Sequence, residues 1–132
     1  MTSQRARDLD EVKSWAVAAA RAADDKQGQD TLVLEVGSVL AITDAFVITS
    51  GSNTRQVRTI TDEIEAAVKR VGGPAPLRIE GLSDLQWVLL DYGDFVAHVF
   101  LDEARDFYQL ERLWGDAPQV PWATSAAAAS GE

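Results

Sequence analysis

Two apolar strands joined by a tight turn constrain the fold of this chain more than any other feature. Residues 86–91 and 95–101 are rich in Val, Leu and aromatic side chains, and only three residues, centred on Gly93, separate them. So short a connection, with a glycine that readily takes a positive φ, is typical of an antiparallel β-hairpin. Every side chain from 87 to 90 is apolar, although neighbouring side chains on a strand point to opposite faces. The sequence therefore predicts a hairpin whose first strand is apolar on both faces of its sheet.

The other elements follow from hydrophobic periodicity. Apolar residues recur at helical spacing in residues 9–23 and again in 57–71, which predicts two long amphipathic helices. Shorter apolar runs predict strands at 31–36, 45–50 and 77–80, and helical turns at 102–108 and 110–114. The order αββαβββα predicts an α/β domain with a mixed five-stranded sheet. We expect the two long helices to cover one face, and the C-terminal helix or a partner to cover part of the other.

The length of 132 residues suits a single domain with one core. We expect this domain to occupy residues 1–117. Residues 118–132 contain two prolines followed by a run of Ala, Ser and Gly, with little apolar content to bury. This composition predicts a mobile tail.

Charge and cysteine content exclude several classes of protein. The chain carries 21 acidic against 12 basic residues, a net charge of -9, so it repels phosphate backbones and favours a basic protein as its partner over sequence-specific nucleic acid. It has no cysteine, which excludes disulfides, thiolate catalysis and cysteine-based metal sites. No apolar run reaches the length of a membrane span, and the first residues do not resemble a targeting segment. We therefore expect a cytoplasmic protein without membrane association.

The most enzyme-like element is Gly51-Ser52, between a predicted strand and a predicted helix. Such an element can bring backbone amides close to a phosphate, as in nucleotidyltransferases. Those enzymes also need carboxylates that hold magnesium together. The nearest acids are Asp62, Glu63 and Glu65, inside the predicted helix, where residues two apart point to different sides. We interpret them as a solvated helix face and predict no enzymatic activity.

A structural role explains the same motif. Asn53 is a good N-cap residue, and Gln56, three positions later, can complete a capping box. We favour this turn and cap over a phosphate site, because short glycine motifs are common.

His98 and two aspartates are the remaining candidates for chemistry. His98 is the only histidine, and the sequence offers no base–acid pair around it, so we expect it to lie in the core or in an interface. Asp91 and Asp94 flank the hairpin turn, where aspartate usually accepts hydrogen bonds from the local backbone. No third ligand is near them, so we predict neither a metal site nor a cofactor.

Aromatic residues are dense around the hairpin: Trp87, Tyr92, Phe100, Phe107, Tyr108 and Trp114. Some must belong to the core, but Trp and Tyr are also enriched where proteins bind one another. Trp87 and Tyr92 lie near the two ends of one strand and on opposite faces, and both readings stay open for them.

The chain resembles the ribosomal silencing factor family, also called iojap-like, over most of residues 9–117. The resemblance rests on segments in a fixed order: residues 43–48, Gly51-Ser52 with Arg55, Glu80-Gly81, residues 87–94, residues 96–100 and residues 105–114. It implies a nucleotidyltransferase-like fold without catalytic carboxylates. It also implies binding to the large ribosomal subunit through its L14-type protein, which blocks joining with the small subunit and represses translation when nutrients are scarce. Family members tend to form homodimers.

Within that frame we predict that the hairpin is the docking surface. Trp87 would be a buried anchor and Tyr92 an amphipathic one. Asp91 and Asp94 would meet basic residues of the partner, and His98 lies on the adjacent strand. Residues 107–114 are expected to support this surface from behind. The alternatives are a nucleotidyltransferase-like nucleotide-binding protein and a homodimeric adaptor for another basic partner.

Overall fold

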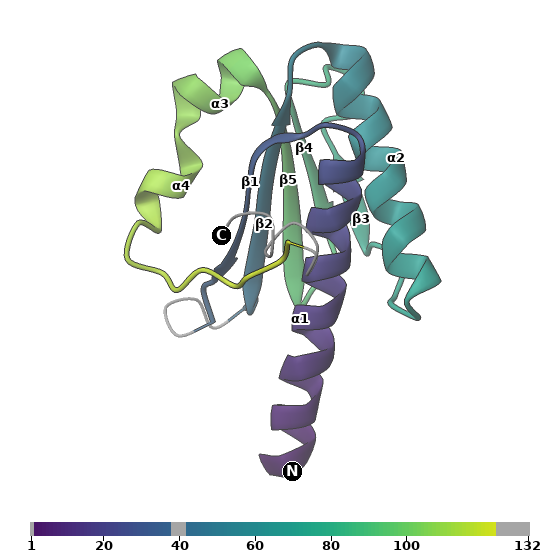
Figure 1. Cartoon of the computed structure of the whole chain (residues 1–132), viewed down its shortest axis with the longest axis vertical. Helices are drawn as coiled ribbons and strands as arrows, with labels where there is room; N and C mark the ends of the chain where they lie inside the picture. The colour runs from purple at the N-terminus through teal and green to yellow at the C-terminus, as the bar shows by residue number, and fades with distance from the viewer. Residues whose placement is uncertain (1, 38–41, 124–132) are drawn as a thin grey trace.

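The computed structural model describes residues 2–37 and 42–123, which form the predicted α/β domain (Figure 1). Its elements are α1 (Thr2–Asp25), β1 (Gln29–Glu35), β2 (Ala45–Gly51), α2 (Thr54–Arg70), β3 (Arg78–Glu80), β4 (Trp87–Asp91), β5 (Phe95–Leu101), α3 (Asp102–Tyr108) and α4 (Leu110–Leu113). The five strands make one sheet in the order β1-β2-β5-β4-β3. Only β2 and β5 run parallel, and the other neighbours are antiparallel. The prediction of a mixed five-stranded sheet is confirmed.

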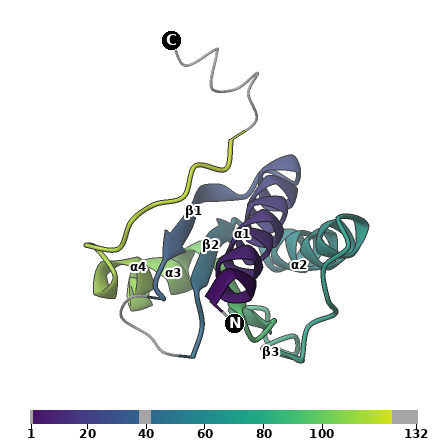
Figure 2. The same cartoon turned by 90° about the horizontal axis from the view of Figure 1, so that it is seen from below.

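Three layers build the domain. The long helices α1 and α2 lie on one face of the sheet, and the short helices α3 and α4 lie on the other (Figures 1 and 2). No helix among the described residues is long and apolar enough to cross a membrane. The two long helices cover one face of the sheet, and the short helices cover only part of the other, as expected (Figure 1).

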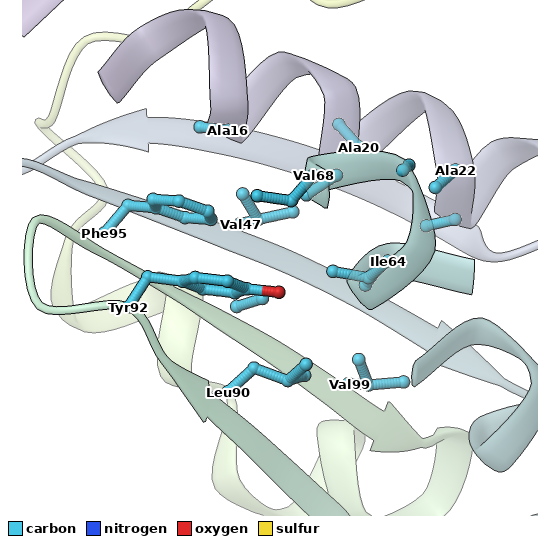
Figure 3. Close-up of a cluster of buried hydrophobic side chains, with 14 of the residues drawn as sticks. Ala16, Ala20, Ala22, Val47, Ile64, Val68, Leu90, Tyr92, Phe95 and Val99 are labelled. Carbon is cyan, nitrogen blue, oxygen red and sulfur yellow. The ribbon is translucent and has the colours of Figure 1, made fainter. Parts of the chain in front are cut away.

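The main core lies between the long helices and the sheet (Figure 3). α1 faces it with alanines such as Ala16 and Ala20, whose small side chains let the helix approach the strands closely. α2 contributes Ile64 and Val68, both fully buried. Burying one such aliphatic side chain stabilises the fold by about 1.5–3 kcal/mol, so helix and sheet are held together mainly by apolar contact.

Tyr92 belongs to this main core. Only 5% of it is exposed, and its ring stacks on Phe95 with centroids 4.5 Å apart and an interplanar angle of 6°. Val88, Leu90 and Tyr92 point to the helix-covered face, whereas Trp87 packs with the residues of the opposite face. The prediction that Trp87 and Tyr92 lie on opposite faces of the sheet is confirmed. The two side chains therefore cannot belong to the same binding surface.

Arg105 ties α3 to the sheet. Only 6% of it is exposed, and its guanidinium donates to the backbone oxygens of Gln29 (2.9 Å) and Asp30 (2.7 Å) at the start of β1. It also pairs with Glu111 at 3.2 Å, which joins α4 to the same point. Asp102 lies in the first turn of α3 and does not cap it, because Leu101 occupies the N-cap position. Its carboxylate instead interacts favourably with the positive end of the helix dipole, at the N-terminus of α3.

The chain beyond residue 117 contacts the edge of the sheet. The amide of Glu35 donates to Pro118 O (2.8 Å), and that of Val120 donates to Val33 O (2.8 Å). The Nε1 of Trp122 donates to Thr31 O at 3.0 Å. Part of the segment that composition predicted to be a mobile tail is therefore folded along β1. The rest of that predicted tail, residues 124–132, lies outside the described residues.

Candidate functional site

An apolar groove opens on the face of the sheet that α3 and α4 leave uncovered. Its volume is about 390 Å³. Side chains from β2, β3, β4 and β5 and from the neighbouring loops line it: Ile42, Thr43, Phe46, Leu77, Arg78, Glu80, Leu89, Asp91, Gly93, Val96 and His98. Ile42 is 84% exposed and Leu77 is 75% exposed, although both are large aliphatic residues. Exposed aliphatic side chains around a concave apolar surface are typical of a protein-binding site.

His98 is a buried polar residue of this groove. It pairs with Leu89 of β4 and Ile48 of β2 in the sheet, and only 4% of it is exposed. Its Nδ1 accepts a hydrogen bond from Nε1 of Trp87 at 3.1 Å, and the ring of Phe46 packs edge-on with centroids 4.7 Å apart. Burial lowers the pKa of His98 from 6.5 to about 4. The imidazole is therefore neutral at physiological pH, because a charged ring is poorly solvated there.

Trp87 lies beside the groove and is half-buried. Its ring packs against Phe100 with centroids 4.8 Å apart and against Tyr108 of α3 with centroids 4.9 Å apart. Since its only ring N–H is already bonded to His98, Trp87 has apolar surface to offer a partner but no free donor.

Asp91 and Asp94 occupy the ends of the hairpin turn. Oδ1 of Asp91 accepts from the amide of Gly93 at 2.8 Å, which confirms the predicted local hydrogen bond, and Gly93 takes the predicted positive φ of 84°. Oδ2 of Asp91 pairs with Arg78 at 3.2 Å. Asp94 is exposed. The two carboxylates therefore give the end of the groove near the turn a negative character that Arg78 partly offsets.

The structure thus separates the five predicted site residues. Asp91 and His98 line the groove, Trp87 bonds to His98, Asp94 stands at the turn, and Tyr92 lies in the core on the other face. Sequence reasoning missed the aliphatic walls. Leu89 and Val96 could have been predicted, because strand alternation places them on the same face of the sheet as His98. Ile42 and Leu77 come from loops, which carry no periodic signal.

The helix N-terminus after Gly51-Ser52 is capped by side chains of its own chain. Asn53 caps α2 by accepting from the amide of Gln56 at 2.8 Å, as predicted. Oε1 of Gln56 accepts from the amide of Ser52 at 2.7 Å, so it reaches one residue beyond the capping-box position. Its Nε2 donates to Lys26 O (3.1 Å) and Gln27 O (3.0 Å). Two amides at this helix N-terminus, those of Ser52 and Gln56, are therefore bonded to side chains of the motif itself, which supports its structural role as a turn and cap.

The acids that follow the motif lie on α2, as predicted. Asp62 pairs with Arg58 at 3.2 Å and Glu63 pairs with Arg70 at 2.9 Å, both on the helix surface. Within the described ranges, no group of three His, Cys, Asp or Glu side chains could hold a metal ion. These ion pairs at the helix surface agree with the interpretation of the acids as a solvated face of α2.

Comparison with known proteins identifies the family. Residues 9–132 match the family described as ribosomal silencing factor during starvation. This chain belongs to that family. The family consists of ribosome-associated regulators of translation. The match confirms the family predicted from sequence, and the similar solved structure described below confirms the fold.

Three relatives of this ribosomal silencing factor illustrate the match. The ribosomal silencing factor of Bacillus subtilis is 41% identical over 106 residues, which cover 80% of this chain and 89% of the relative. The mouse protein named mitochondrial assembly of ribosomal large subunit protein 1 is 32% identical over 91 residues, 67% of this chain and 40% of the mouse protein. A crystal structure of a protein from Chromobacterium violaceum is similar with a TM-score of 0.72 and 28% identity, and covers 88% of this chain and 92% of that one.

Proposed function

We propose that this protein binds the large ribosomal subunit through its L14-type protein and blocks joining with the small subunit, above all when nutrients are limited. The observation that carries the proposal is the apolar groove on the uncovered sheet face. Its exposed aliphatic residues, Ile42 and Leu77, are costly in water unless a partner covers them. The family description and the large-subunit name of the mouse relative support the ribosome as the place of action.

The charge of the protein suits a basic ribosomal protein. The net charge is -9, and Glu80 and Asp91 line the groove while Asp94 is exposed at the turn beside it. Opposite charges accelerate encounter and select partners more than they add affinity. The apolar walls would then supply most of the binding free energy. Action at cytoplasmic ribosomes is part of this proposal.

Steric exclusion is the simplest mechanism for such a protein. His98 is poorly suited to act as a base, since burial lowers its pKa to about 4 and its Nδ1 is engaged with Trp87. A folded domain of 14.3 kDa held on the surface that meets the small subunit is large enough to prevent the two subunits from joining. Repression then needs occupancy alone, and no catalysis.

Four of the predicted contact residues remain in the proposal. His98 and Asp91 contact the partner in the groove, Trp87 adds apolar surface beside it, and Asp94 meets basic residues near the turn. Tyr92 is left out as a contact, because it is buried beneath the long helices.

A pair of matched leucine variants tests the docking surface. Leu77 at the groove and Leu113 on α4 are 75% and 74% exposed, so serine at either position should leave the fold intact. We expect Leu77→Ser to weaken co-sedimentation with purified large subunits by about tenfold, because an apolar contact is lost, and Leu113→Ser to bind like wild type. The docking surface would be misplaced if the two variants bound equally well. If the wild-type protein failed to sediment with large subunits, or failed to prevent their joining with small subunits, the function itself would be wrong.

Self-association is the second part of the proposal. We expect a homodimer that uses the same uncovered apolar face, so that dimerisation and docking compete. Dilution should then favour ribosome binding. Analytical ultracentrifugation would detect the dimer, and a crosslinked dimer that bound large subunits as well as the monomer would contradict the competition.

A further inference from the structure

Two buried polar atoms in the groove lack a hydrogen-bond partner. They are Nε2 of His98 and Oγ1 of Thr43, and neither contacts a donor or acceptor within residues 2–37 and 42–123. His98 is 4% exposed and Thr43 is 6% exposed, so solvent reaches neither side chain freely. Buried polar groups are nearly always paired, since each unpaired one costs about 1–3 kcal/mol. Unpaired polar atoms in an otherwise apolar groove indicate that an occupant completes them.

The contact with Trp87 fixes which proton His98 carries. An indole N–H can only donate, so Nδ1 of His98, its acceptor at 3.1 Å, must bear a lone pair. The ring is neutral because burial lowers its pKa to about 4, and a neutral imidazole has one N–H. The proton is therefore on Nε2. His98 therefore presents the groove with a fixed hydrogen-bond donor, and not with an acceptor or a cation.

We infer that Nε2–H of His98 donates to an uncharged oxygen of the docked partner, so that the partner segment filling the groove pairs an aliphatic side chain with a neighbouring carbonyl, amide or hydroxyl oxygen. This inference rests on the proposed docking function and specifies the chemistry of the partner. The walls formed by Phe46, Leu89 and Val96 accept the aliphatic part. Shape and hydrogen bonding together then select the segment.

The charged residues of the groove decide against a carboxylate as the acceptor. Glu80 and Asp91 line the same groove, and Arg78 is already paired with both, at 3.4 Å and 3.2 Å. A partner carboxylate would enter an apolar site beside two like charges whose counter-ion is engaged, which costs more than it gains. An uncharged oxygen avoids this repulsion. A basic partner that presents a backbone carbonyl next to an aliphatic side chain suits the donor of His98, the apolar walls and the acidic residues of the groove.

Two substitutions separate the donor from the rest of the ring. Asparagine can place an oxygen near the position of Nδ1 and still accept from Trp87, but it has nothing at the position of Nε2. Glutamine can place an N–H donor near the position of Nε2, but it loses the acceptor for Trp87. We expect His98→Asn to weaken binding to purified L14-type protein and to large subunits by about tenfold, because the partner oxygen is left unpaired. His98→Gln should bind within about threefold of wild type, with circular dichroism as the control for folding.

A second measurement needs no variant. His98 is the only histidine, so a protein labelled with ¹⁵N-histidine gives one unambiguous pair of ring nitrogen signals. In the free protein Nε2 should carry the proton and Nδ1 should not, and saturating L14-type protein should shift the Nε2–H signal. A proton on Nδ1, an unmoved Nε2 signal in the complex, or equal binding by His98→Asn and His98→Gln would overturn the inference while leaving docking intact. A wild-type protein that bound neither the L14-type protein nor large subunits would overturn both.

Discussion

The indole Nε1 of Trp87 donates a hydrogen bond to Nδ1 of His98, which lies 3.1 Å away on the neighbouring strand. The two residues are diagonal neighbours on the face of the sheet that carries the groove, so the half-buried indole helps to shield the imidazole from water. This contact links the hairpin to the floor of the groove. Burial of the imidazole makes its protonation matter for the stability of the whole domain.

We predict that His98 makes the domain less stable in mild acid. Its pKa is about 4 in the folded protein against 6.5 in the unfolded chain, so the unfolded chain binds the proton more readily. The contribution of neutral His98 to the free energy of unfolding is fully present above about pH 6.5. It is lost as the pH falls from 6.5 to about 4, and it does not change further below pH 4. The total loss is about 3 kcal/mol, at about 1.4 kcal/mol per unit. Urea unfolding of the wild type between pH 4 and 7 measures it.

His98→Asn is the control for this pH dependence. Asparagine does not titrate, so the difference in unfolding free energy between wild type and variant isolates the histidine from the carboxylates that titrate in both. The difference should change by about 3 kcal/mol across the range. A difference that stays constant with pH would show that His98 is solvated or already charged in the folded protein.

Arg105 should be among the most sensitive positions for stability. Replacing it by alanine leaves the backbone oxygens of Gln29 and Asp30 without their buried donor and frees Glu111 from α3. We expect Arg105→Ala to lower the free energy of unfolding by about 3 kcal/mol. Chemical denaturation measures this loss.

Two further variants test the geometry of that clamp. Lysine keeps the charge but lacks the planar fork that reaches both oxygens, so Arg105→Lys should recover only part of the loss. Arg112→Ala, at an exposed position on α4, should change stability by less than about 0.5 kcal/mol. If Arg105→Lys were as stable as wild type, the charge alone, and not the paired hydrogen bonds, would hold α3 in place.

Local patterns determined most of the fold in advance. The hairpin was predictable because Gly93 and two flanking apolar strands form a short-range signal, and the cap of α2 was predictable because Asn53 precedes a regular apolar stripe. Strand alternation also placed Trp87 and Tyr92 on opposite faces. The same alternation also implies that Trp87 and Tyr92 cannot contact the same partner surface. Tyr92 shares its face of the sheet with Leu90, beneath the long helices.

Long-range contacts were not predictable from those patterns. The clamp of Arg105 joins residues 75 and 76 positions apart, and nothing in a short acidic helix marks that arginine as buried. The pairing of Gln119 with Leu34 likewise depends on the position of β1 as an edge strand and not on the composition of the last residues. The groove itself arises because α3 and α4 are too short to cover the whole sheet face, which becomes apparent only after assembly.

We predict that the segment along β1 protects the sheet edge. A chain ending at Ala117 loses the bonds of Pro118 and Val120 to β1 and the contact of Trp122 with Thr31. Its free energy of unfolding should fall by about 2 kcal/mol, and the unpaired edge should promote self-association. Thermal unfolding and size-exclusion chromatography measure the two effects. A chain ending at Ala123 keeps all three contacts and should behave like the full chain, whereas an unchanged protein ending at Ala117 would contradict the role of this segment.

Tyr92 offers the clearest test of core against contact. Its hydroxyl is buried and has no partner among the described residues, and burial raises the pKa of this phenol above its usual value. Removing only the hydroxyl removes an unpaired polar group, so Tyr92→Phe should leave stability unchanged or raise it by about 1 kcal/mol. Tyr92→Ala should lower it by about 3–5 kcal/mol, because the ring stacked on Phe95 is replaced by a cavity. Binding of Tyr92→Phe to large subunits should equal that of wild type, since the ring lies on the face opposite the groove. Weaker binding by a fully folded Tyr92→Phe would return Tyr92 to the contact surface.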